Sequence, residues 1–352
     1  MIDHPYKHST ARAFWSRAVS AGWRPDEVVT SEQPLIRAGE KVVSAGSCFA
    51  ANLVPYLERA GFEYLRTETP HPAFQSCADE ALSYGKFSAQ YGNIYTSRQL
   101  LQLLQRALGR FRPTEDRWLG YDGIIDPFRP GLRFKARSNA EFDLLSAQHL
   151  ACVAAAFSQA DVLIYTLGLT EAWVSRIDGA VFPACPGTVA GEFDPERHAF
   201  ENYTVFETNR DLDEFLDLLR SVNPNVRVIL TVSPVPLVAT ATGQHVLAAT
   251  MYSKAVLRVA AQEATRRRSN VTYFPAFEIV TGPQAPETFF DSSRRNVTTE
   301  AIDTVMHAFF ANCSLPADGA GQVQPPERAP DIARLSRDIV AAECEEMFAD
   351  RP

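Results

Sequence analysis

Residues 41–61 read KVVSAGSCFAANLVPYLERAG, and this stretch decides the fold. Its first part is an apolar, strand-forming run that ends in small side chains at Gly46 and Ser47. The continuation has the spacing of a helix and closes at Gly61. A buried strand that turns directly into a helix is the repeating unit of a parallel α/β sheet.

Four more strands follow the same logic. Runs of buried type occupy 161–167, 227–232 and 271–275, and a weaker one occupies 62–65. Helical patterns at 140–160, 205–222 and 244–268 precede the three stronger runs, and another at 298–312 follows the last. Continuous Val, Ile and Leu runs are typical of strands buried on both faces. The sequence therefore predicts an α/β fold: a three-layer, doubly wound, parallel five-stranded sheet.

The rest of the chain is expected to decorate this sheet. A polar start with a short helix at 10–21 predicts an N-terminal extension over 1–40, before an α/β domain at 41–314. Insertions at 110–134 and 172–203 are expected to roof the sheet edge, the second through a hairpin around Asp178-Gly179. Their aromatic side chains either stack on sugar or acyl groups or simply pack the roof. The composition of 315–330 predicts a linker, and 331–348 predicts a C-terminal helix.

Composition narrows the classes of partner. The net charge of -8 comes with no basic stripe, which argues against nucleic acid. The six cysteines form no CxxC pair and indicate reduced thiols of a cytoplasmic protein. No apolar run approaches the ~18 residues of a membrane span, and the first residues lack the apolar core of a secretion signal. No metal-ligand cluster or phosphate loop is present, so no metal or cofactor is implied.

Ligands of open parallel sheets bind outside the carboxyl ends of the strands. That rule selects small and polar residues that follow the first, third and fourth strands: Ser47, Gly168, Thr170, Glu171 and Ser233. Ser47 has two interpretations. A hydroxyl on a tight strand-to-helix turn suits a nucleophile, while a serine there is also a common helix cap. Cys48 is an alternative nucleophile or a core residue.

Several blocks in order resemble the GSCFA domain family, a branch of the SGNH/GDSL hydrolase superfamily. They are the opening stretch and YGNIYTSRQLLQL, TLGLTEAW, ILTVSPVPLVAT, YSKAVLR and VTYFPAFEI, which together span about 41–310. The resemblance implies a flavodoxin-like sheet. It also implies ester hydrolysis or acyl transfer, often in association with polysaccharide, so the expected substrate is a small-molecule or saccharide acyl ester.

Carried over residue by residue, the resemblance makes Ser47 the nucleophile and its N–H an oxyanion donor. Gly92, followed by Asn93, matches the glycine of the second superfamily block. Gly168 heads the third block, where the superfamily usually has GxND. Thr170 stands in place of that asparagine, and a hydroxyl can still donate.

The last block departs from the superfamily, whose acid and base lie in a DxxH motif. Setting Asn296 at the histidine puts Ser293 at the aspartate, whereas taking Asp291 as the acid gives Arg294 as its partner. Neither register supplies a histidine, and a serine without a base is a poor nucleophile. Asp291 and Glu171 remain possible acids. Arg294 and Arg295 either hold an anionic substrate group or form a solvated rim.

Two histidines are candidates for the missing base. His245 follows the fourth strand in a loop on the expected site side, and many GSCFA relatives carry a histidine soon after their Ser-Pro-Val. His71, after the second strand, is the other. Three functions stay open: a serine esterase or O-acyltransferase with an atypical base, a degenerate saccharide- or acyl-binding protein, and a scaffold that uses its terminal helix.

Overall fold

The structure is a computed structural model, and it describes residues 3–29, 31–69, 86–132 and 134–315. The expected linker beyond residue 315, the expected helix at 331–348 and His71 lie outside the described residues.

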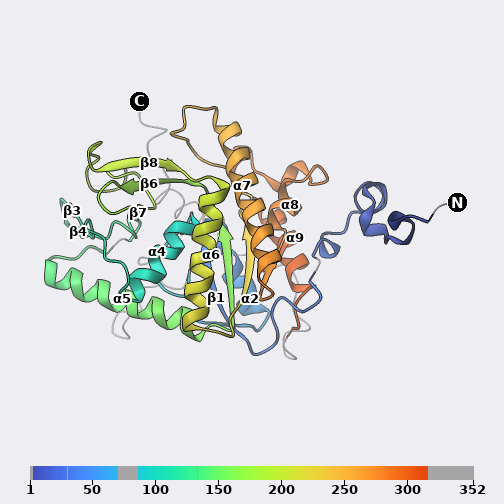
Figure 1. Cartoon of the computed structure of the whole chain (residues 1–352), viewed down its shortest axis with the longest axis horizontal. Coiled ribbons are helices and arrows are strands. Elements are labelled where there is room, and N and C mark those ends of the chain that lie inside the picture. The colour runs from blue at the N-terminus through green and yellow to red at the C-terminus, as the bar shows by residue number, and fades with distance from the viewer. Residues whose placement is uncertain (1–2, 30, 70–85, 133, 316–352) are drawn as a thin grey trace.

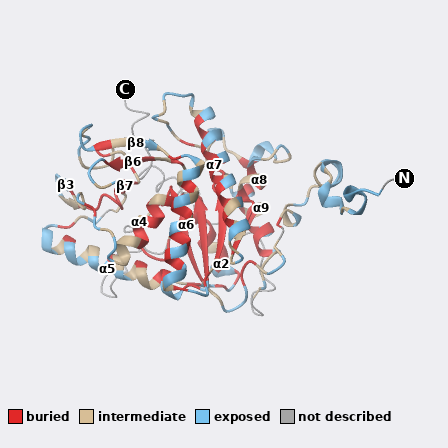
Figure 2. Ribbon diagram, in the orientation of Figure 1, coloured by how far each residue is buried: buried red, intermediate tan, exposed pale blue. Residues whose placement is uncertain are grey.

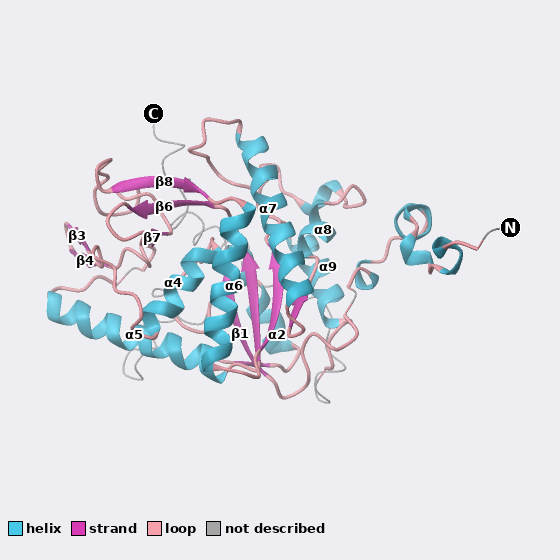
Figure 3. Cartoon of the chain, viewed as in Figure 1, coloured by secondary structure: helices cyan, strands magenta, loops and turns pink. Residues whose placement is uncertain are grey.

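The centre of the molecule is a five-stranded parallel sheet (Figure 3). Its strands lie in the order β10 (Val271–Tyr273), β9 (Arg227–Val232), β5 (Val162–Leu167), β1 (Lys41–Gly46) and β2 (Glu63–Tyr64). All neighbouring pairs are parallel. This confirms the predicted doubly wound sheet, and the order of the strands is that of the flavodoxin-like class.

Helices cover both faces of the sheet. One apolar core lies between the sheet and α4 (Ser97–Ala107), α5 (Asn139–Gln159), α6 (Val205–Val222) and α7 (Val246–Arg267). The other lies under α1 (Cys48–Ala51), α2 (Leu53–Arg59), α8 (Ala276–Thr281) and α9 (Thr299–Phe310). Successive strand residues alternate between the cores, since Val42 joins one and Val43 the other. Figure 2 shows the resulting buried central layer.

The two insertions form small antiparallel sheets. The first contains the hairpin of β3 (Trp118–Gly120) and β4 (Gly123–Ile125). The second contains β7 (Val181–Phe182), β6 (Glu171–Ser175) and β8 (His198–Asn202), in that order across the sheet. β6 and β7 pair as the hairpin expected around Asp178-Gly179. This three-stranded sheet lies beyond the carboxyl ends of the central strands (Figure 1).

Local structure departs from the sequence pattern in two places. Instead of one continuous helix at 10–21, the N-terminal part has short helical turns: the 3-10 helices η1 (Pro5–His8), η2 (Ala11–Ala13) and η4 (Pro25–Glu27), and the π-helix η3 (Ser16–Ser20). None of these turns buries a residue, so no packing stabilises a longer helix. The helix after Ser47 is divided at Asn52 into α1 and α2. A further short turn, η6 (Glu287–Phe289), precedes α9.

Among the described residues, no helix is both long and apolar enough to cross a bilayer.

Candidate active site

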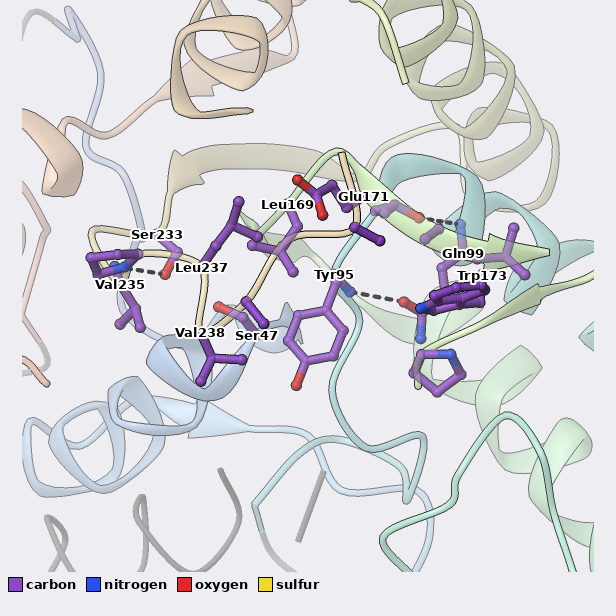
Figure 4. A pocket seen from close by; sticks show the side chains of 18 of the residues that line it. Ser47, Tyr95, Gln99, Leu169, Glu171, Trp173, Ser233, Val235, Leu237 and Val238 are labelled. Atoms are coloured by element: carbon purple, nitrogen blue, oxygen red, sulfur yellow. Dashed lines mark hydrogen bonds between the residues drawn. The ribbon is translucent and has the colours of Figure 1, made fainter. Parts of the chain in front are cut away.

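A cavity of about 110 Å³ lies where β1, β5 and β9 end (Figure 4). β1 contributes Ser47, β5 contributes Gly168 and β9 contributes Ser233. The chain leaves β1 for β2 on one side and later returns to β5 on the other, so this is the point where strand order reverses. We call it the Ser47 cavity.

The hydroxyl of Ser47 is buried and has no hydrogen-bond partner among the described residues. The residue occupies the N-cap position of α1 in an extended conformation, but its side chain makes no capping hydrogen bond. Only 4% of Ser47 is exposed. Buried hydroxyls are normally paired. Six other hydroxyls of the described residues are also buried and unpaired, and what distinguishes Ser47 is its place at the ligand-binding edge of the sheet. The structure therefore does not show Ser47 as a side-chain cap of α1. The side chain of Cys48 is outside what it describes.

Two glycines let the backbone close tightly around Ser47. Gly46 has φ of +144°, and a Cβ there would lie 2.5 Å from the carbonyl oxygen of Thr166. A Cβ on Gly168 would lie 3.1 Å from the carbonyl oxygen of Tyr95 and 3.4 Å from the Cβ of Ser47. A larger residue at either position would push apart the elements that carry the hydroxyl.

A loop before α4 is clamped over the ends of β1 and β5. The N–H groups of Gly168 and Leu169 donate to the Tyr95 carbonyl oxygen at 3.1 and 2.9 Å. The Gln99 side chain accepts from the Tyr95 N–H and donates to the Asn93 carbonyl oxygen, both at 2.9 Å. These bonds hold Tyr95 in the cavity wall, where Figure 4 shows its ring with Ser47.

Three expected oxyanion residues lie outside the lining of the cavity. Gly92 is a turn residue with φ of +67°. The Asn93 side chain donates to the Tyr95 hydroxyl at 3.1 Å. The Thr170 hydroxyl donates to Asn202 at 2.7 Å. Their oxyanion role stays a prediction.

The degenerate last motif forms a turn that carries Arg295 to the cavity. The Asp291 carboxylate accepts from the Ser293 N–H at 2.9 Å and from the Asn296 side chain at 3.1 Å. Burial alone would raise the pKa of Asp291, but hydrogen bonds from Ser293 and Asn296 lower it below its usual value. Arg294 has φ of +58°, and Arg295 lines the cavity. Neither Asp291 nor Asn296 lines it.

His245 caps the exposed start of α7. Its Nδ1 accepts from the Leu247 N–H at 3.2 Å. Lys254, nine residues further along α7, lines the cavity and lies about 13 Å from His245 along the helix axis. Ala241, four residues before His245, also lines the cavity, but His245 itself does not. No histidine is among the described residues that line the Ser47 cavity.

The sequence patterns did not single out Lys254. It is 1% exposed, and its Nζ donates to the Gly168 carbonyl oxygen at 2.8 Å. A signal was present, because Lys254 lies at helical spacing with the buried residues Thr250 and Leu257. A lysine in the buried stripe of a helix needs a polar environment, and here the cavity supplies it. Glu171 is the described acidic residue of the lining, and its Oε1 accepts from the Thr240 hydroxyl at 2.7 Å.

Aromatic side chains of the second insertion close the cavity. Trp173, Phe182 and Phe200 line it, and the rings of Trp173 and Phe200 lie 5.6 Å apart. Phe182 also packs against Trp118 and Phe128 of the first insertion. Some of these rings therefore face the cavity while others pack the roof, and their stacking on sugar or acyl groups stays a prediction. Within the described ranges, no three His, Cys, Asp or Glu side chains are grouped to hold a metal.

The fold and the cavity define a doubly wound α/β protein with a serine at its ligand-binding edge. The GSCFA family model matches residues 41–309, and the chain belongs to the GSCFA family.

Two solved structures share a distant likeness with the chain. One is a carbohydrate esterase family 2 enzyme with a carbohydrate-binding domain from Corynascus thermopiles (Myceliophthora fergusii). It is 11% identical with a TM-score of 0.28, over 89% of this chain and 68% of that chain. The other is an acetyl xylan esterase from the rumen bacterium Butyrivibrio proteoclasticus, 13% identical with a TM-score of 0.24, over 68% of this chain and 55% of that chain. At these TM-scores the likeness supports no functional conclusion. No curated protein matches the sequence.

Proposed function

We propose that the protein is a serine esterase or O-acyltransferase with Ser47 as its nucleophile. The observation that supports this most is the buried, unpartnered hydroxyl of Ser47 at the switch point of the sheet. Placing such a hydroxyl away from water has a free-energy cost that a packing role does not explain.

The reaction follows from this geometry. Ser47 Oγ loses its proton to a base and bonds to the ester carbonyl carbon, while the N–H of Ser47 donates to the developing oxyanion. The bond from the carbonyl carbon to the alcohol oxygen then breaks, and the alcohol leaves with a proton. Water or a second alcohol attacks the acyl-serine and restores the hydroxyl. The small volume of the Ser47 cavity favours a short acyl group, and its aromatic wall suits a saccharide alcohol.

The base lies outside the usual motif. His245 serves only if the segment before α7 moves toward the cavity, whereas Glu171 already lines it. A carboxylate accepts a proton less readily than an imidazole at neutral pH, so Glu171 as base implies slow acylation. The two candidates are separated by Glu171→Gln and His245→Gln, because only the variant that removes the base abolishes acylation.

The experiment is hydrolysis of a series of p-nitrophenyl esters from acetate to octanoate. We expect the rate to fall with chain length and to vanish in Ser47→Ala. Ser233→Ala is the matched control, since Ser233 is a buried serine that follows β9, two strands from β1, and its Oγ accepts from the Val235 N–H at 3.3 Å. Loss of that hydrogen bond should lower the rate at most about tenfold.

A non-catalytic binding protein is the second candidate, and the described cavity lining, which contains no histidine, favours it. Under this alternative, no ester of the series is hydrolysed, and Ser47→Ala behaves like the natural protein. Its ligand would be a saccharide or acyl compound held in the same cavity.

A further inference from the structure

A second, wider cavity adjoins the Ser47 cavity. It has a volume of about 760 Å³ and lies between the N-terminal segment, α7, α8 and the turn before α9. We call it the apolar groove, because most of its large side chains are apolar: Trp15, Val19, Trp23, Leu247, Met251, Phe277 and Phe290.

The apolar groove and the Ser47 cavity share part of their wall. Four residues line both of them: Pro236, Leu237, Lys254 and Arg295. The two cavities therefore lie side by side, and two cationic side chains, Lys254 and Arg295, stand where they meet.

Basic side chains gather at this boundary, and the acidic Glu171 lines the Ser47 cavity. Lys254 and Arg295 stand at the boundary, and Arg294 also lines the groove. Glu278 is the described acidic residue of the groove, and it already accepts from Arg258 at 2.5 Å and from the Tyr273 hydroxyl at 2.8 Å. Arginine and lysine together at a partly enclosed site are typical of phosphate recognition.

The wall of the groove leaves large apolar side chains in contact with water. Leu247, Met251 and Trp15 are 64%, 59% and 61% exposed. Clustered exposure of this kind marks a surface that buries itself against an apolar ligand. Because the cations lie between this surface and Ser47, a matching ligand would carry its acyl ester, its anionic group and its aliphatic chain in that order.

We propose that the site takes a lipid phosphate: an acylated head group in the Ser47 cavity, a phosphate at Lys254 and Arg295, and a single aliphatic chain in the apolar groove. The acylated head group rests on the proposed function, whereas binding of the phosphate and the chain does not. The substrate class is then an ester carried on a lipid-linked phosphate precursor.

The experiment is equilibrium binding of dodecyl phosphate below its micelle concentration, followed by tryptophan fluorescence because Trp15 and Trp23 line the groove. We expect each methylene between octyl and dodecyl phosphate to tighten binding about two- to fourfold. Butyl phosphate tests the anion alone, and dodecyl maltoside tests the chain alone. Both should bind at least about tenfold more weakly than dodecyl phosphate.

Three variants locate the ligand. Arg295→Gln should weaken the binding of dodecyl phosphate about tenfold and leave the binding of dodecyl maltoside unchanged. Leu247→Asp should weaken both amphiphiles. Val259→Asp is the matched control, since Val259 is on α7 and 49% exposed but lines neither cavity. The proposal would be overturned if the affinity for alkyl phosphates did not depend on chain length. It would also be overturned if Leu247→Asp and Val259→Asp weakened binding equally.

Ser47→Ala separates this inference from the proposed function. We expect the variant to bind dodecyl phosphate like the natural protein. If no ester is hydrolysed but this binding persists, the lipid phosphate site stands without the hydrolase. If Ser47 hydrolyses esters but dodecyl phosphate binds no better than butyl phosphate, the lipid phosphate site is wrong.

Discussion

Replacing Ser47 with alanine should stabilise the protein, and the sign of this change tests what the serine does. The variant removes a buried hydroxyl that has no partner among the described residues. An unsatisfied buried polar group costs about 1–3 kcal/mol. Allowing for the small void left by the oxygen, we expect the free energy of unfolding to rise by about 1 kcal/mol. If the hydroxyl were a helix cap, the same substitution would lower it by about 1 kcal/mol.

A true cap in the same chain supplies the control. Thr204 begins α6 with a capping box: its hydroxyl accepts from the Glu207 N–H at 3.3 Å, and the Glu207 carboxylate accepts from the Thr204 N–H at 2.9 Å. Thr204→Ala should therefore destabilise the protein by about 1 kcal/mol. Because the two substitutions change the free energy of unfolding in opposite directions, the two alanine variants should differ from each other by about 2 kcal/mol.

The measurement is urea-induced unfolding followed by fluorescence. For a chain of 352 residues, 1 kcal/mol changes the melting temperature by only about 1–2 °C, so the free energy of unfolding is taken from complete urea curves. Equal destabilisation by Ser47→Ala and Thr204→Ala would refute the reasoning, because Ser47 would then be a structural cap.

Two further predictions concern the surroundings of the site. Gly46→Ala should destabilise the protein by about 3 kcal/mol or more, because the new Cβ would clash with Thr166. The control is Gly39→Ala: Gly39 also has positive φ, but a Cβ there would have nothing within 4 Å, so this variant should lose only about 1 kcal/mol. Similar urea midpoints for the two variants would contradict this. Burial lowers the pKa of His149, whose Nδ1 lies 2.7 Å from the Glu68 carboxylate. The folded state thus favours the neutral ring, so its stabilisation is complete above about pH 6.5 and is lost as pH falls below that value. In His149→Asn, the free energy of unfolding should depend less on pH between about pH 6.5 and 5. An unchanged pH dependence would show that other groups are responsible for it.

The fold followed from the sequence because its central strands are continuous apolar runs. Such runs can only be buried on both faces, and the strand bounds at 227–232 agree with β9 (Arg227–Val232) residue for residue. The N-terminal helix was wrong because helical spacing alone does not supply a surface to pack against. No pattern predicted α4 as a helix, although Thr96 caps it and four leucines bury one face.

The site was predictable only in part. Strand ends can be read from the sequence, so Ser47, Gly168, Glu171 and Ser233 were chosen and line the cavity, whereas Thr170, chosen by the same rule, does not. Arg295 came instead from the degenerate last motif, and it also lines the cavity. Side chains that reach the cavity from a helix cannot be found that way. Lys254 was missed for this reason. His245 was chosen from its position after the fourth strand; it does not line the cavity, and its role as a base stays a prediction.

The most direct test of the central claim is intact-protein mass spectrometry after exposure to a serine-directed fluorophosphonate, which requires no assumption about substrate. We expect a single adduct on the natural protein, carried by Ser47 and absent from Ser47→Ala. An adduct that persists in Ser47→Ala, or none on the natural protein at any pH tried, would contradict it.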